Sequence, residues 1–304
     1  QYENKQFIQQ SNENLDDIPN ALTDFEIEIE TPSYLKLSSN LEENLLLKVN
    51  KNYYSLKASN KQEAVLYLQT KNTFITYKNE LIEVSCGIDD AKVNETKKAE
   101  LIDKITRFTD EKLGKSFTHK ILISQEDYQR QPFYGLNQLP GFLSPFSDEF
   151  MFELKFLKAY LNNYLKENLQ LNPRKEAWIY DGIQVFLMMN YIEKYYPNTK
   201  MTGNLADLKL LKSYHFINLP FNQQYNYLQM LMARKNLDQA LNEPKNKLIK
   251  FNEQIANKYK AGLSLNYLDN FLGNQIVNSS IKEFMLLNQY SSSNTRQFET
   301  ILEK

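Results

Sequence analysis

The sequence predicts an α+β fold in which an N-terminal β unit precedes a mostly α-helical domain. Two patterns support this prediction. Apolar and polar residues alternate over 25–85, as in half-buried strands, whereas the apolar residues after Val93 recur at helical spacing. The motif Cys86-Gly-Ile-Asp-Asp90 interrupts both patterns. We therefore expect a polar lead-in over 1–24, a β unit over 25–90 and an α-rich domain over 91–304.

The strands of the β unit are expected at four places. Phe25-Glu-Ile-Glu-Ile-Glu30 alternates with a period of two, as a strand does when one of its faces is buried. Apolar runs at 45–49, 64–68 and 73–77 follow it at hairpin spacing. The β unit is therefore small.

The α-rich domain is expected to begin with one amphipathic helix. Its apolar face would contain Leu101, Ile102, Ile105 and Phe108, and Gly114 is a typical helix end. A strand is expected at 119–124, followed by a loop rich in Gly, Pro and Phe at 131–147. Further helices are expected near 149–168, 175–196, 221–235, 245–272, 275–288 and 293–303.

The composition limits the kinds of partner. Of the 304 residues, 42% are hydrophobic and 13% aromatic, which is enough for packed cores. The 36 basic and 37 acidic residues give a net charge of -1, so no overall field attracts nucleic acid or an anionic membrane. No apolar run is long enough to cross a bilayer, and the polar start is unlike a signal peptide. We therefore expect a protein or peptide partner and, since no methionine begins the chain, a longer parent protein.

The cysteine and histidine content excludes several kinds of site. The single cysteine, Cys86, allows no intrachain disulfide, and its acidic neighbours Asp89 and Asp90 would raise its thiol pKa. The two histidines, His119 and His215, are far apart and belong to no H-E-x-x-H motif, so the chain is not a working zinc peptidase of that type. Each is expected to be a surface or capping residue. The sequence also lacks the glycine motifs of nucleotide-binding proteins and serine hydrolases.

Three segments of the α-rich domain resemble motifs of one peptidase family. Trp178-Ile-Tyr-Asp-Gly-Ile-Gln-Val-Phe186 resembles W-L-x-E-G-x-A-x-[YF], and Lys258-Tyr-Lys-Ala-Gly262 resembles Y-x-K-G. Upstream, Tyr134-Gly-Leu-Asn-Gln-Leu-Pro140 resembles the strand G-A-M-E-N-P. These motifs belong to the gluzincin aminopeptidases, the family of aminopeptidase N and leukotriene hydrolase. The resemblance covers roughly 25–304 and implies a thermolysin-like, mostly helical metallopeptidase-like domain after the end of a β domain.

The resemblance also assigns roles to individual positions. It places Asp181 where the family has a glutamate as its third zinc ligand, and Tyr259 where a tyrosine stabilises the oxyanion. The strand that holds the substrate's backbone and free amino group in the family corresponds here to Tyr134, Gly135, Asn137 and Gln138. Asn137 and Gln138 stand where a glutamate is expected, so recognition of an amino group is in doubt.

The two histidine ligands of the family have no counterpart. In the best register, Phe152-Glu153-Leu154-Lys155-Phe156 stands where H-E-x-x-H belongs, and phenylalanine has no lone pair to donate. Asp181 alone could not hold a catalytic zinc ion. The register leaves 25 residues from Phe156 to Asp181, where the family has roughly nineteen, and so requires a short insertion around 168–173. We expect no metal and no other cofactor.

Each candidate residue also has an ordinary structural interpretation. Glu153 is either a former general base or a charge on an amphipathic helix. Asp181 is either a vestigial ligand or a buried carboxylate that requires hydrogen-bond partners. Tyr259 either lines a cleft or packs in the core. The aromatic residues Phe133, Tyr134, Phe142 and Phe146 either line a peptide groove or plug it.

The sequence favours a catalytically inactive, aminopeptidase-like domain, a pseudopeptidase that binds a protein or peptide or acts as a scaffold. The alternative is a metallopeptidase-type hydrolase with a non-standard site that uses Glu153, Asp181 and Tyr259. A third interpretation is a structural part of a large envelope assembly. The abundance of Asn, Lys, Tyr and Ile is typical of AT-rich bacterial genomes, including those of the Bacteroidota, which favours the bacterial periplasm or cell envelope.

Overall fold

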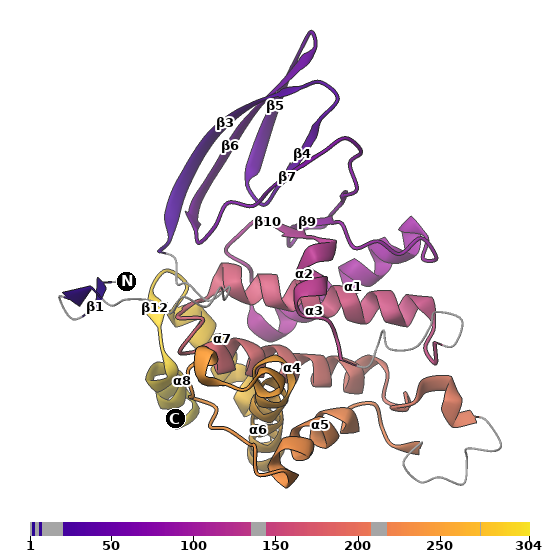
Figure 1. Ribbon diagram of the computed structural model, residues 1–304, viewed down its shortest axis with the longest axis vertical. Helices are drawn as coiled ribbons and strands as arrows, with labels where there is room; N and C mark the ends of the chain where they lie inside the picture. The colour runs from indigo at the N-terminus through magenta and orange to yellow at the C-terminus, as the bar shows by residue number, and fades with distance from the viewer. Residues whose placement is uncertain (1, 4–5, 8–20, 135–143, 208–217, 274) are drawn as a thin grey trace.

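In the computed structural model, a slender β unit stands on a larger helical body (Figure 1). The structure describes residues 2–3, 6–7, 21–134, 144–207, 218–273 and 275–304. The predicted α+β fold, with a β-rich part followed by a mostly helical part, is confirmed. Of the polar lead-in expected over 1–24, the structure describes the short paired strands β1 (Tyr2–Glu3) and β2 (Gln6–Phe7) and residues 21–24, of which the last two already belong to the next strand.

The β unit contains two antiparallel sheets. One has the strand order β3-β6-β5, formed by β3 (Thr23–Pro32), β6 (Lys51–Lys61) and β5 (Glu42–Lys48). The other pairs β4 (Lys36–Ser39) with β7 (Leu66–Gln69). Between them lies a small core of Leu37, Leu41, Tyr54 and Leu56. This core holds far fewer buried side chains than that of the helical body, so the β unit has little apolar burial of its own.

A three-stranded sheet connects the β unit to the helices. β9 (Glu83–Cys86) pairs antiparallel with β8 (Ile75–Lys78) and parallel with β10 (Lys120–Ile123), and α1 (Glu95–Leu113) forms the connection between the two parallel strands. Val84 and Ile121 belong to the core of the helical body. The domain division at residue 90 stays a prediction. The side chains of β8 and β9 pack against the core of the helical body.

The remaining helices form the body (Figure 1). They are α2 (Gln125–Arg130), α3 (Asp148–Asn168), α4 (Ala177–Tyr195), α5 (Gln223–Arg234), α6 (Asn257–Leu272), α7 (Ile276–Leu287) and α8 (Thr295–Leu302). Short elements lie between them: β11 (Gln170–Leu171), β12 (Ser292–Ser293) and 3-10 turns at Gly203–Asp207 and Lys245–Lys247. The helix expected over 245–272 begins later, because a π-helical turn at Asn252–Ala256 precedes α6. No helix among the described residues is long and apolar enough to cross a membrane.

Two glycines let α4 and α6 approach closely. A Cβ atom at Gly262 would lie 2.3 Å from Val185 Cγ1, and one at Gly182 would lie 3.1 Å from the Cβ atom of Ala261. Only glycine avoids the first of these clashes, so the two helix backbones pack against each other at this point. Near this contact, Asp181 on α4 and Lys258, one helical turn before Gly262 on α6, lie next to each other.

Candidate functional site

The carboxylate of Asp181 on α4 forms an ion pair with a buried lysine of α6. Lys258 Nζ lies 3.1 Å from Asp181 Oδ1, and only 7% of the Lys258 side chain and 19% of the Asp181 side chain are exposed. Lys258 Nζ also donates a hydrogen bond of 3.0 Å to Gln131 Oε1. A buried charge is tolerated when it is paired and hydrogen-bonded, and both conditions hold here.

A second lysine, Lys158 of α3, lies beside this pair. Lys158 Nζ donates to Gln184 Oε1 over 3.3 Å, and Gln184 Nε2 donates back to the Lys158 carbonyl oxygen over 2.8 Å. The pKa of Lys158 is lowered to about 7, chiefly by burial of the ammonium group and in addition by the nearby charge of Lys258, while Asp181 opposes the change. Two buried lysine side chains from different helices therefore interact electrostatically with one carboxylate, and one of them, Lys258, forms an ion pair with it.

The residues around Asp181 do not fit a zinc ion. Zinc needs lone pairs from several side chains, whereas a protonated lysine offers only N–H donors. Phe152 and Phe156 are completely buried and stack on each other with ring centroids 6.2 Å apart. Within the described ranges, no three His, Cys, Asp or Glu side chains are placed to hold a metal ion.

Glu153 is buried in a separate cluster at the far end of α4. Its carboxylate accepts hydrogen bonds from the hydroxyl groups of Tyr191 and Tyr196 and forms an ion pair with Lys104. Burial and this carboxylate together raise the pKa of Tyr191. Tyr191 follows Asp181 by ten residues, or about 15 Å of helix. The structure therefore does not bring Glu153 and Asp181 together.

Sequence reasoning identified Asp181 but missed its ion-pair partner Lys258 and the neighbouring pair of Lys158 and Gln184. A usable signal was present in the spacing. The family spacing of roughly nineteen residues, counted back from Asp181, ends at Asn162, and Lys158 lies one helical turn before it. The register with Phe152 and Phe156 at the ligand positions stays a prediction.

Tyr259 packs in the core beside Tyr225. The two rings meet edge to face with centroids 4.8 Å apart, and burial raises the pKa of Tyr259. Tyr134 is 37% exposed and contacts Phe251 edge to face, with ring centroids 6.2 Å apart. Gly135, Asn137 and Gln138 lie outside the described residues, as do Phe142 and His215. The predicted substrate strand therefore remains a prediction.

The described members of the aromatic run pack against the body. Phe133 stacks on Phe221 with ring centroids 5.9 Å apart, and Phe146 meets the same ring edge to face at 5.7 Å. Phe133 is only 4% exposed. Both side chains therefore pack against Phe221 of the helical body.

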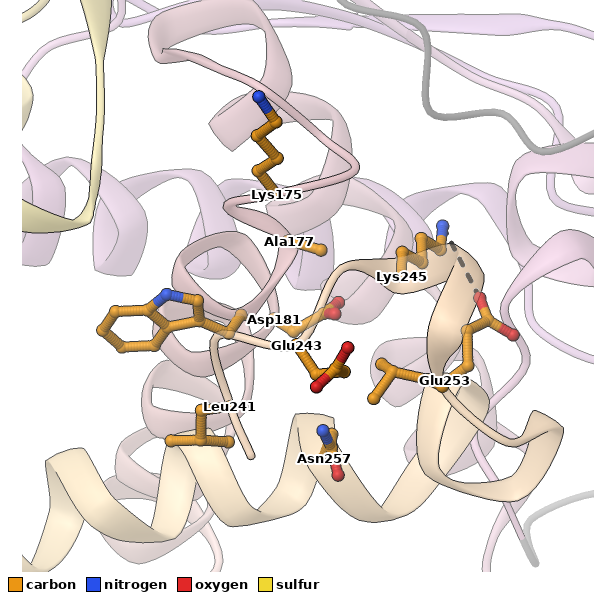
Figure 2. A pocket seen from close by; sticks show the side chains of 10 residues that line it. Lys175, Ala177, Asp181, Leu241, Glu243, Lys245, Glu253 and Asn257 are labelled. Carbon is orange, nitrogen blue, oxygen red and sulfur yellow. Dashed lines mark ion pairs between the residues drawn. The ribbon is translucent and has the colours of Figure 1, made fainter. Parts of the chain in front are cut away.

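A small cavity adjoins Asp181 and is lined on its other sides by residues of 241–257 (Figure 2). Its volume of about 20 Å³ accommodates roughly one water molecule. Figure 2 shows the carboxylates of Asp181 and Glu243 directed into this space, with Asn257 beneath them and the ion pair of Lys245 and Glu253 at its edge. The cavity is too small for a peptide substrate.

A larger cleft of about 630 Å³ lies where the β unit meets the helical body. It has the size of a small-ligand site and contains charges of both signs. The lining residues include Asp24, Glu26, Lys57, Phe117, His119 and Tyr290. His119 is exposed there, as expected for a surface residue.

Cys86 is buried in β9 and is not an activated thiol. Burial is the main cause that raises its pKa to about 11. The predicted direction of the shift was therefore correct, but its cause was wrong, because burial dominates and the contributing carboxylate is that of Glu95, not of Asp89 or Asp90.

Comparison with solved structures relates the arrangement of the elements to known proteins. The M1 zinc metallopeptidase from Deinococcus radiodurans matches with a TM-score of 0.59 and 8% identity, over 94% of this chain and 61% of that chain. A variant of that enzyme bound to a Tyr-Ser-Ala substrate matches with a TM-score of 0.58 and 10% identity, over the same shares. This chain has the fold of the M1 metallopeptidases.

The likeness extends to the fold alone. This chain spans only about three fifths of the length of the M1 structures that it matches. No protein-family model and no curated protein matches the sequence. What the M1 metallopeptidase-like chain does must therefore be argued from its own residues.

Proposed function

We propose that this M1 metallopeptidase-like chain is a non-catalytic domain that binds a protein or peptide partner. The observation that carries the proposal is the buried ion pair between Lys258 and Asp181. The sequence resemblance assigns Asp181 to the family's third zinc ligand, and its carboxylate is already paired with a cation that belongs to the protein. A further doubly charged ion would meet repulsion from the ammonium group of Lys258 and, at pH values below about 7, from that of Lys158 as well.

The alternative, a hydrolase with a non-standard site, lacks a catalytic arrangement among the described residues. Its three candidate residues have separate surroundings. Glu153 contacts two tyrosines and a lysine, Asp181 pairs with a lysine of α6, and Tyr259 packs against an aromatic ring. A general base must lie within hydrogen-bond reach of the group that it activates. The three side chains are not arranged around a common space.

The kind of partner follows from charge and from the larger cleft. The net charge of -1 does not favour nucleic acid. The cleft combines acidic and basic side chains with the aromatic pair of Phe117 and Tyr290, whose ring centroids are 5.8 Å apart. A peptide segment supplies charges of both signs and apolar side chains, so it matches this lining. The abundance of Asn, Lys, Tyr and Ile favours a setting in the bacterial cell envelope.

Metal analysis of the purified chain by mass spectrometry tests the non-catalytic part of the proposal. The chain is analysed before and after incubation with zinc and dialysis, and hydrolysis of a tripeptide is measured in both samples. We expect far less than one zinc ion per chain and no hydrolysis. One tightly held zinc ion per chain, with a hydrolysis that Asp181→Ala abolishes without unfolding the protein, would show that the chain is an enzyme.

Selection from a displayed random-peptide library against the immobilised chain tests the binding part. Enriched peptides should lose affinity when Tyr290→Ala removes one ring from the cleft. Tyr267→Ala is the matched control, because Tyr267 is similarly exposed, at 66% against 59%, but lies on α6 outside the cleft. A selection that enriches no peptide, or peptides that Tyr290→Ala leaves unaffected, would contradict binding at this cleft.

A further inference from the structure

The edge strand β5 exposes a run of apolar side chains. Leu46 is 66% exposed, Leu47 is 71% exposed, and Val49 in the following turn is 90% exposed. Among the described residues, β5 pairs only with β6, so the N–H and C=O groups along its other edge have no strand partner. An apolar, unpaired edge is normally blunted by charge, proline or a covering element, because it readily pairs with another strand.

The two ends of β5 carry complementary charges. Glu42 begins the strand and Lys48 ends it, with Leu45 midway between them. In the part of the chain that the structure describes, neither Glu42 nor Lys48 forms an ion pair. Within its own sheet Lys48 lies opposite another cation, Lys51, so it has no carboxylate across the β5–β6 ladder.

We propose that β5 is a homodimer interface, at which β5 of a second copy of this chain pairs antiparallel with it about a two-fold axis through Leu45. This register sets Glu42 of each copy opposite Lys48 of the other and creates two ion pairs across the strands. Leu46 then lies opposite Asn44, and Leu47 opposite Glu43. The same strand serves both copies, as an isologous two-fold interface requires.

The charges select the antiparallel direction. In a parallel pair, Glu42 would face Glu42 and Lys48 would face Lys48, and like charges directly opposite one another destabilise a sheet. The antiparallel pair joins two three-stranded sheets into one of six strands. A single strand per copy buries less than the roughly 800 Å² per partner of a stable complex, so the dimer should dissociate in the micromolar range.

Charge reversal tests the register by sedimentation velocity across the micromolar range. The full chain should form dimers as its concentration rises. Glu42→Lys alone and Lys48→Glu alone should each weaken dimerisation by about tenfold or more, because each places like charges opposite one another. An equimolar mixture of the two variants should dimerise again, since every Glu then faces a Lys. Circular dichroism checks that each variant is folded.

A second pair of variants tests the apolar contact. Leu46→Lys should abolish dimerisation, whereas Leu286→Lys, on α7 and similarly exposed at 62%, should not change it. The proposal is overturned if the unaltered chain stays monomeric at all concentrations. It is also overturned if the single charge variants dimerise as well as the unaltered chain, or if their mixture stays monomeric.

Discussion

The amino group of Lys158 is fully buried, and the free energy of unfolding should therefore depend on pH. Its pKa is about 7 in the folded chain and 10.5 for the ordinary side chain, so the unfolded state binds the proton more tightly. The free energy of unfolding should therefore rise between pH 7 and pH 10.5, and below pH 7 the full cost of burying the charge remains. Lys158 thus destabilises the fold most at neutral and acidic pH.

Lys158→Met should remove this cost. We expect the free energy of unfolding at pH 7 to rise by up to about 4 kcal/mol, less the lost bond to Gln184, and the gain to shrink toward pH 10. Urea unfolding at several pH values measures both effects. Lys155→Met is the control, because Lys155 is partly exposed, lies 3.8 Å from Asp90 and should show no such dependence on pH. Parallel pH profiles for the chain and Lys158→Met would contradict the expectation.

At the scale of single residues, the sequence predicted which positions could form a site but not which side chains contact them. The motif with Asp181 located a carboxylate on α4, and the second motif located Lys258 and Tyr259 on α6. The crossing angle between α4 and α6 determines which of these side chains are in contact. The periodicity of the sequence does not predict this angle. A motif match therefore identified Asp181 without identifying the lysine that neutralises it.

At the scale of elements, the contact of α4 with α6 depends on Gly262. A methyl group there would lie within 2.3 Å of Val185 Cγ1 and 3.1 Å of the backbone nitrogen of Phe186, so the helices would have to move apart. We expect Gly262→Ala to destabilise the chain by about 2 kcal/mol or more, although alanine is the better helix former. Thermal unfolding measures the loss.

Gly182→Ala is the graded comparison for Gly262→Ala. Its added methyl group would meet Ala261 Cβ at 3.1 Å, a tight contact that a small shift relieves. The loss should therefore be smaller than for Gly262→Ala. Equal losses, or a gain at Gly262, would mean that the helix contact is not limited by these glycines.

The predictions of helices and strands were correct where the buried residues of an element are apolar and regularly spaced. Most helices of the body show apolar side chains at helical spacing, and the observed bounds of α3, α4, α5, α7 and α8 lie within a few residues of those expected. The helix expected over 245–272 begins only at Asn257, and the short helix α2 was not expected. β6 was missed because its inward residues include Asn52, a polar side chain that is buried because it donates to the carbonyl oxygens of Ser33 and Leu35. Such hydrogen bonds depend on tertiary structure and leave no apolar signal in the sequence.

Histidine substitutions on α3 can test which pair of positions corresponds to the two histidine ligands of the family: 158 and 162, or 152 and 156. In a Lys258→Met background, Lys158→His with Asn162→His places two imidazoles one turn apart near Asp181, and we expect zinc to bind with about one ion per chain. The matched control, Phe152→His with Phe156→His, puts the imidazoles into the stacked aromatic core and should bind no zinc. Zinc titration followed by thermal unfolding measures both, and the opposite result would support the Phe152 and Phe156 register.

At the scale of the whole molecule, the β unit depends on its attachment to the helical body. Its own core consists of four buried apolar side chains, too few to stabilise it strongly. The attachment is made at the end of α3, where Glu167 accepts a hydrogen bond of 3.1 Å from Asn40 and forms an ion pair of 2.8 Å with Lys61. The side chains of Lys61 and Glu167 are only 6% and 14% exposed, so this pair is little screened by solvent.

Glu167→Gln should therefore loosen the β unit while leaving the helical body intact. Loss of the charge leaves the ammonium group of Lys61 buried without a counter-ion, which should cost about 2 kcal/mol at the junction. Hydrogen exchange should quicken in β3, β5 and β6 but not in α4. Glu26→Gln breaks an exposed ion pair with Lys57 in the same sheet and should have little effect. If exchange quickened equally in α4, the two parts would unfold as one cooperative unit, and the large helical core would stabilise the β unit directly.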